Sequence, residues 1–108
     1  MVLAHSETST DRAFLDSGQY TRESILKYEL VYGANFVSPG GKQCADRLIR
    51  KLDLNPGRSV LDVGCGLGGS AFLMKQKFGL NVDAIDLSDN MLELARLRLT
   101  KAGLDSQV

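Results

Sequence analysis

The run from Val60 to Ser70, VLDVGCGLGGS, constrains the fold more than any other part of the chain. A β-branched and apolar stretch ends at Gly64, four glycines fall within residues 64–69, and the apolar residues of a helix follow up to Gly79. A strand that leads through a glycine-rich turn into a helix presents backbone N–H groups and lets a ligand approach closely. The sequence therefore predicts a ligand-binding turn at the carboxyl end of a strand.

A second strand and helix follow this first pair. NVDAIDLS, from Asn81, has the composition of a strand, and the next segment has the periodicity of a helix that ends at Gly103. The positions expected to face the core are Met91, Leu92, Ala95, Leu99 and Ala102. Strand, helix, strand, helix in these lengths is a βαβα unit, which predicts an α/β fold with a parallel sheet covered on both faces.

The N-terminal half is expected to be helical. Residues 1–10 turn polar after the first four and are predicted to be disordered. Residues 11–55 contain three helical patterns, over 11–17, 21–33 and 38–54. Thr21 is a predicted N-cap, and Ser38 is another with Pro39 at the first helical position. Ala45, Leu48, Ile49 and Leu52 form an apolar stripe on the third helix. Residues 56–108 hold the βαβα unit.

Composition excludes several classes of function. Thirteen basic and thirteen acidic residues give no net charge, so no long-range field attracts nucleic acid. No apolar run approaches the ~18 residues of a membrane span, and the first ten residues lack the apolar core of a secretory signal. Two cysteines, Cys44 and Cys65, are too few for a disulfide framework or a zinc site. A cytoplasmic protein without a metal is the expectation.

Two glycine fingerprints overlap in the turn. Gly64-x-Gly66-x-x-Gly69 is typical of dinucleotide sites, and Gly64-x-Gly66-x-Gly68 of S-adenosylmethionine sites. Asp86 follows Gly64 by 22 residues (86 − 64), near the spacing of a ribose-binding carboxylate in both classes. Asp62 separates them, because its charge suits a ligand with an amino acid end and a sulfonium and opposes a pyrophosphate.

These residues carry a family resemblance. Asp62-x-Gly64-x-Gly66-x-Gly68 and Asp86-x-Ser88-x-x-Met91 resemble the first two motifs of the class I S-adenosylmethionine-dependent methyltransferases. The resemblance implies S-adenosylmethionine as cofactor and S-adenosylhomocysteine as product. It also implies a Rossmann-like sheet of about seven strands, of which this chain supplies two, preceded by a helical lid. The predicted cofactor-binding residues are Val37, Ser38, Asp62, Gly64, Gly66, Asp86 and Leu87.

The lid resembles that of the phosphoethanolamine N-methyltransferases. Its matching features are Gln19-Tyr20-Thr21, Tyr28-Glu29, Tyr32-Gly33 and Phe36-Val37-Ser38-x-Gly40-Gly41. The resemblance implies that Tyr20 closes over the amine as the catalytic residue and that Gln19, Tyr20, Tyr28 and Ser38 bind the substrate. Packing alone is the alternative role for the tyrosines. The histidine that the family pairs with its tyrosine is missing, since the one histidine is His5 in the polar N-terminus.

The expected activity is therefore N-methylation of phosphoethanolamine or its methylated derivatives. The two predicted strands suggest the N-terminal part of a methyltransferase, inactive alone and prone to self-association through uncovered sheet edges. Alternatives are a non-catalytic cofactor-binding or regulatory fragment, a methyltransferase for another small amine or lipid-like acceptor, and a dinucleotide-binding fragment. Cys65 is expected to fill space, because no activating base accompanies it.

Overall fold

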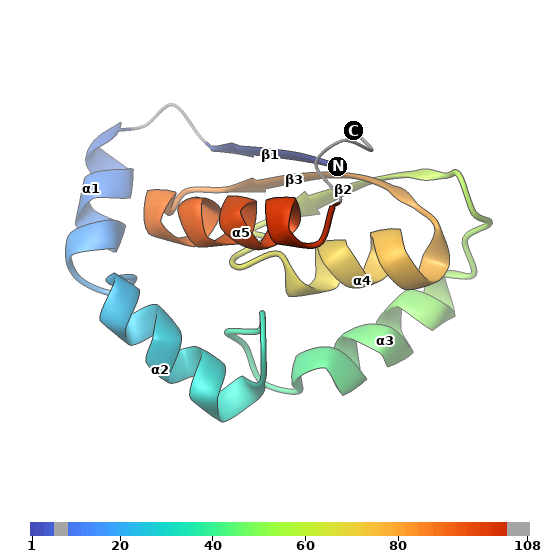
Figure 1. Ribbon diagram of the computed structural model, residues 1–108, viewed down its shortest axis with the longest axis horizontal. Coiled ribbons are helices and arrows are strands. Elements are labelled where there is room, and N and C mark those ends of the chain that lie inside the picture. The colour runs from blue at the N-terminus through green and yellow to red at the C-terminus, as the bar shows by residue number, and fades with distance from the viewer. Residues whose placement is uncertain (6–8, 104–108) are drawn as a thin grey trace.

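The computed structural model describes residues 1–5 and 9–103. Within these ranges the chain forms three strands and five helices (Figure 1). In chain order they are β1 (Val2–His5), α1 (Ser9–Ser17), α2 (Arg22–Tyr32), α3 (Gly41–Leu52), β2 (Ser59–Val63), α4 (Gly69–Phe78), β3 (Asn81–Asp86) and α5 (Asp89–Lys101). The predicted α/β class and the βαβα unit are confirmed.

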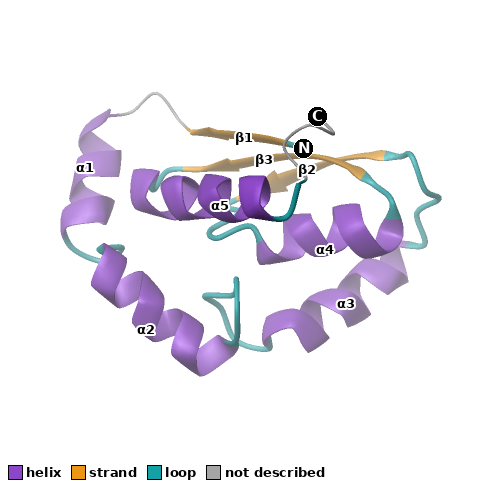
Figure 2. Cartoon of the chain, in the orientation of Figure 1, coloured by secondary structure: helices purple, strands orange, loops and turns teal. Residues whose placement is uncertain are grey.

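The three strands form one parallel sheet in the order β1-β3-β2. Their arrows point the same way in Figure 2. Val63 of β2 pairs with Ile85 of β3, so both strands end at the same edge of the sheet. The loops that lead into α4 and α5 therefore leave the sheet side by side, as ligand-binding loops do in open parallel sheets.

The N-terminus differs from its prediction. The expected disorder over residues 1–10 is wrong for Val2–His5, which pairs in parallel with residues 83–86 of β3. The edge of β3 otherwise leaves its N–H and C=O groups unpaired, and the four residues of β1 suffice to pair them. The sheet thus has three strands where the sequence predicts two. Residues 6–8 lie outside the described part of the chain.

The main core lies between the sheet and α4 and α5, which pack on one of its faces (Figure 1). Val82 and Ala84 point into it from β3, and Ala95 and Leu99 from α5. The expected covering of both faces is not present in the described residues, because Leu61 and Val63 on β2 are 61% and 70% exposed. The core positions predicted on the last helix are confirmed except for Ala102, which is exposed beyond the helix end.

The three N-terminal helices surround this core on its helical side (Figure 1). Thr21 caps α2 as predicted, accepting a hydrogen bond from the Ser24 N–H. The predicted start of α3 is wrong, because the helix begins at Gly41 and its cap is Gly40 in a left-handed conformation. Of the predicted α3 stripe Ile49 is buried and Ala45 partly so, whereas Leu48 and Leu52 are more than half exposed. No helix in the described part of the chain is both long and apolar enough to cross a membrane.

Candidate functional site

A cavity of about 710 Å³ opens where β2 and β3 end. Its floor comes from the glycine turn and from the end of β3. Its roof comes from residues between 15 and 38 of the N-terminal helical segment (residues 11–55), which we call the lid. The lining residues are Leu15, Tyr20, Asn35, Phe36, Val37, Ser38, Asp62, Val63, Gly64, Cys65, Gly66, Gly69, Ser70, Ile85, Asp86, Leu87 and Met91. The cavity thus joins residues from both halves of the chain.

The glycine turn is shaped by backbone conformations that favour glycine. Gly64 and Gly66 have φ values of +76° and +57°. The Gly64 and Cys65 N–H groups both donate to the Ile85 carbonyl, at 2.8 and 3.0 Å, which ties the turn to the end of β3. A Cβ atom on Gly64 would meet no protein atom within 4 Å, so this position leaves the space beside the turn open.

Asp86 links the turn to α5. Its Oδ2 accepts from the Gly66 N–H at 2.7 Å, and its Oδ1 accepts from the Ser88 N–H at 2.8 Å. Each carboxylate oxygen keeps a second acceptor site, so Asp86 lines the cavity with capacity for donors such as ribose hydroxyls. Asp86 therefore also organises the backbone of the site, whereas the cap of α5 is Ser88, whose Oγ accepts from the Met91 N–H.

Asp62 is the unsatisfied group of the cavity. Its Oδ2 is buried and has no hydrogen-bond partner within the described residues. Burial raises the pKa of Asp62, and the nearby charge of Asp86 raises it further. Two carboxylates that face one cavity favour a ligand that carries positive charge and N–H donors.

Cys65 is not arranged as a nucleophile. Burial, followed by the charges of Asp86 and Asp62, raises the pKa of the Cys65 thiol to about 12. A thiol with that pKa stays protonated near neutral pH, where only a thiolate attacks efficiently. The geometry agrees with the space-filling role expected from the sequence.

The loop between α2 and α3, which we call the lid loop, is held close to the glycine turn by a charged cluster. Arg98 on α5 forms an ion pair with Glu29 on α2 and donates to Asn35 Oδ1 at 2.9 Å. The Asn35 N–H donates to Glu29 Oε2 at 2.6 Å, while Asn35 itself has a φ of +70°. Burial alone would raise the pKa of Glu29, but the hydrogen bonds from Arg98 and Asn35 outweigh it and lower that pKa.

The same loop contacts Gly69 at the start of α4 so closely that a residue larger than glycine does not fit there. A Cβ atom on Gly69 would lie 2.5 Å from the Asn35 carbonyl oxygen and 2.8 Å from the Phe36 ring. The sequence analysis did not propose Asn35 or Phe36 as site residues. A lone Asn in a loop does not signal a cavity, and Phe36 belongs to the lid motif but was given no contact. Met91, expected to be core alone, is 2% exposed and also lines the cavity.

Most predicted site residues meet in the cavity. Eight of the ten predicted site residues line it, namely Tyr20, Val37, Ser38, Asp62, Gly64, Gly66, Asp86 and Leu87. Gln19 and Tyr28 are not among the lining residues. Gln19 is exposed, and its Nε2 donates to the Tyr20 hydroxyl at 3.4 Å. His5 is the last residue of β1. No cluster of metal-ligating residues occurs in the part of the chain that the structure describes.

Comparison with known proteins relates this arrangement to methyltransferases. Residues 38–108 match the sequence model of a family described as mycolic acid cyclopropane synthetase. Phosphoethanolamine N-methyltransferase 1 of Zea mays is 47% identical over 90 residues, which are 83% of this chain and 18% of the maize protein. The chain thus spans less than a fifth of that relative's length.

Two solved structures of Haemonchus contortus phosphoethanolamine N-methyltransferase 2 have a similar fold, each with a TM-score of 0.84. One is a complex with S-adenosyl-L-methionine, is 39% identical, and matches over 89% of this chain and 23% of its own. The other is a complex with phosphomonomethylethanolamine and S-adenosylhomocysteine, is 40% identical, and matches over 88% of this chain and 22% of its own. The chain therefore belongs to the mycolic acid cyclopropane synthetase family, within the class I S-adenosylmethionine-dependent methyltransferases.

Proposed function

We propose that this chain binds S-adenosylmethionine and forms part of an N-methyltransferase that acts on phosphoethanolamine or its methylated derivatives. The observation that carries the proposal is the shared cavity, in which Tyr20 and Ser38 of the lid meet Asp62 and Asp86 of the sheet. The relatives named above support the choice of cofactor and acceptor.

The residues of the cavity fit this cofactor. The buried Oδ2 of Asp62 lacks a donor within the described residues, and the amino group of the cofactor would supply one. Asp86 would accept from the ribose hydroxyls, with Leu87 beside it. The open space next to Gly64 would admit the cofactor close to the backbone. Val37 and Ser38 would contact the cofactor from the lid side.

When bound, the cofactor supplies an electrophilic methyl group on a sulfonium. In an in-line displacement the acceptor amine would form the new C–N bond as the C–S bond breaks, and the electron pair of that bond would stay on sulfur. The role of the chain is to hold the reacting groups in line and to exclude water. An ammonium cannot attack, so the acceptor nitrogen must first lose its proton. Tyr20 is the proposed catalytic residue, with Gln19, Tyr28 and Ser38 as proposed substrate contacts.

Removal of one hydroxyl tests the role of Tyr20. Tyr20→Phe should lower kcat at least tenfold, a barrier increase of about 1.4 kcal/mol, with little change in cofactor affinity. The ring packs against the small cluster of Ile25, Leu67 and Met91, and Phe keeps that packing. Turnover of phosphoethanolamine by the full-length gene product measures this effect, with Tyr32→Phe as the matched control. Full turnover by Tyr20→Phe would remove the catalytic role.

The family match favours one second candidate, a methyltransferase for a lipid-like acceptor, because the matching family is described by its mycolic acid chemistry. Turnover of an unphosphorylated lipid in preference to phosphoethanolamine would favour that candidate.

Calorimetric titration with S-adenosylmethionine and with NAD separates a methyl-donor site from a dinucleotide site. Cofactor binding without turnover would favour a regulatory fragment. A cytoplasmic location and self-association remain predictions.

A further inference from the structure

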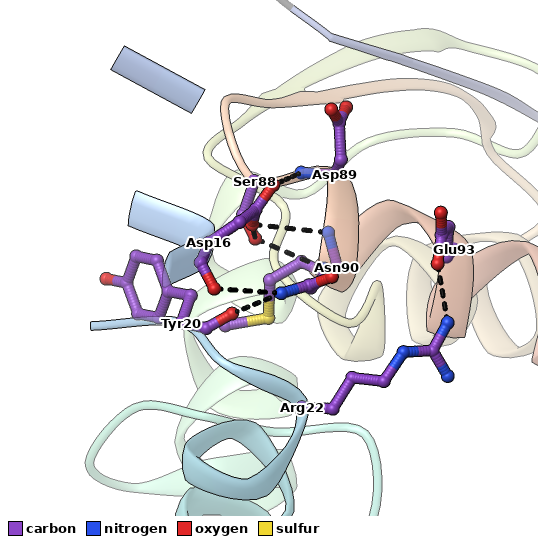
Figure 3. Close-up of polar contacts among 8 residues, drawn as sticks. Asp16, Tyr20, Arg22, Ser88, Asp89, Asn90 and Glu93 are labelled. Carbon is purple, nitrogen blue, oxygen red and sulfur yellow. Dashed lines mark hydrogen bonds and ion pairs between the residues drawn. The ribbon is translucent and has the colours of Figure 1, made fainter. Parts of the chain in front are cut away.

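The lid is fastened to α5 by a cluster of hydrogen bonds around Asp16 (Figure 3). The Asp16 carboxylate accepts from the Ser88 Oγ at 2.6 Å, from the Asp89 N–H at 3.0 Å and from the Asn90 N–H at 3.3 Å. The first N–H groups of a helix have no partner within that helix. A carboxylate from α1 therefore supplies the acceptors for the first turn of α5, where negative charge is also favourable.

Asn90 makes the complementary contact in the opposite direction. Its Nδ2 donates to the Asp16 carbonyl at 3.2 Å and to the Tyr20 carbonyl at 2.8 Å (Figure 3). These two carbonyls belong to the end of α1 and the turn that follows it, so they have no further helical partner to donate to them. One side chain of α5 thereby fixes the backbone of Tyr20 itself.

This cluster is continuous with the cavity. Ser88, which is fully buried, donates its N–H to Asp86 Oδ1 and its hydroxyl to Asp16. Asp86 lines the cavity floor and Tyr20 lines its roof. The floor and the roof are therefore joined by a short chain of hydrogen bonds that runs Asp86, Ser88, Asp16 and then through Asn90 to Tyr20.

We propose that Asp16 and Asn90 are positioning residues that fasten the lid to the first turn of α5 and hold Tyr20 over the cavity. The positioning of Tyr20 for catalysis rests on the proposed function. The attachment of the lid to α5 does not depend on it. Two other contacts join the lid to α5, and neither reaches the backbone of Tyr20. Arg98 holds Glu29 and Asn35 at the far end of α2, and Arg22 and Glu93 pair at 2.5 Å with both side chains more than half exposed. Exposed ion pairs contribute little, so the position of Tyr20 depends on the half-buried Asp16 cluster next to it.

Hydrogen–deuterium exchange without any ligand tests the fastening. Asp16→Ala should speed exchange of the Asp89 and Asn90 amides at least tenfold, because both lose the Asp16 carboxylate as an acceptor. Glu23→Gln is the matched control, since Glu23 pairs only with Lys27 on the exposed side of α2 among the contacts described. Unchanged exchange in Asp16→Ala would overturn the proposal. Asn90→Ala, which should speed exchange in residues 17–22, provides the same test if Asp16→Ala does not fold.

Kinetics of the full-length gene product test the positioning. Asp16→Ala should lower kcat at least tenfold, and Asp16→Glu, which keeps the charge, should restore part of it. If Asp16 acts through Tyr20, adding Asp16→Ala to Tyr20→Phe should lower kcat by less than twofold further. Independent losses that multiply in the double variant would overturn the positioning role. If Tyr20→Phe alone leaves turnover intact, the proposed function fails, and the exchange experiment still decides the fastening.

Discussion

Asp62→Asn removes the charge from the one buried carboxylate oxygen that lacks a partner within the described residues. In the ligand-free chain this charge is unfavourable, because burial and then Asp86 raise the pKa of Asp62 above its ordinary value of 3.8. An acid whose pKa is raised by folding binds its proton more tightly in the folded state, so folding loses stability as pH rises from that ordinary value through the folded pKa. Asp62→Asn should abolish this loss and raise the free energy of unfolding at pH 7.

Ligand affinity should change in the opposite direction. A hydrogen bond between charged groups contributes about 1.5–3 kcal/mol. At about 1.4 kcal/mol per tenfold, Asp62→Asn should weaken S-adenosylmethionine binding roughly 10- to 150-fold. The affinity of the unmodified chain should also fall as pH is lowered through the folded pKa of Asp62, and the variant should lose that dependence.

Two measurements on the unmodified chain and on Asp62→Asn test whether Asp62 binds the cofactor. Urea unfolding at pH 7 without ligand gives the change in stability, and calorimetric titration over a pH series gives the change in affinity. Asp83→Asn is a matched control, because Asp83 is an exposed Asp on the neighbouring strand. An Asp62→Asn variant that is less stable and binds with unchanged affinity would refute the reasoning, since Asp62 would then be a structural acid.

Variants at three further residues test other contacts of the site. Asp86→Ala should weaken cofactor binding by about 1.5–3 kcal/mol in calorimetry, and Asp86→Asn, which keeps an acceptor, should lose less; equal losses would contradict this. Glu29→Gln should cost about 1–3 kcal/mol of unfolding free energy at pH 7. The Glu29 contribution is present above the ordinary pKa of 4.5 and lost as pH falls through the lowered folded value, so the two proteins should converge in acid urea titrations. Gly69→Ala should displace the loop at Phe36 and destabilise by about 1–3 kcal/mol in urea unfolding; no change would show that the loop yields freely.

Local sequence determined the βαβα unit and its chemistry. The change from a strand pattern to glycines and then to a helical pattern is encoded within residues 59–79, and the structure has β2 and α4 there. The capping roles of Thr21 and Ser88 also depend on contacts three residues apart, which the sequence displays directly. Asp62 and Asp86 could be predicted to meet because parallel strands end at one edge of a sheet.

Tertiary structure decided which distant segments share the site. Strand β1 forms because an edge of β3 is available to pair with it, and nothing in residues 2–5 alone distinguishes a strand from a disordered end. The contact of Asp16 with the first turn of α5 spans more than seventy residues, and an isolated Asp in a short helix carries no sequence signal of it. Asn35 and Phe36 enter the cavity because Glu29 and Arg98 hold their loop against Gly69. Periodicity reports the neighbours of a residue along the chain, whereas these contacts depend on how the lid folds back over the sheet.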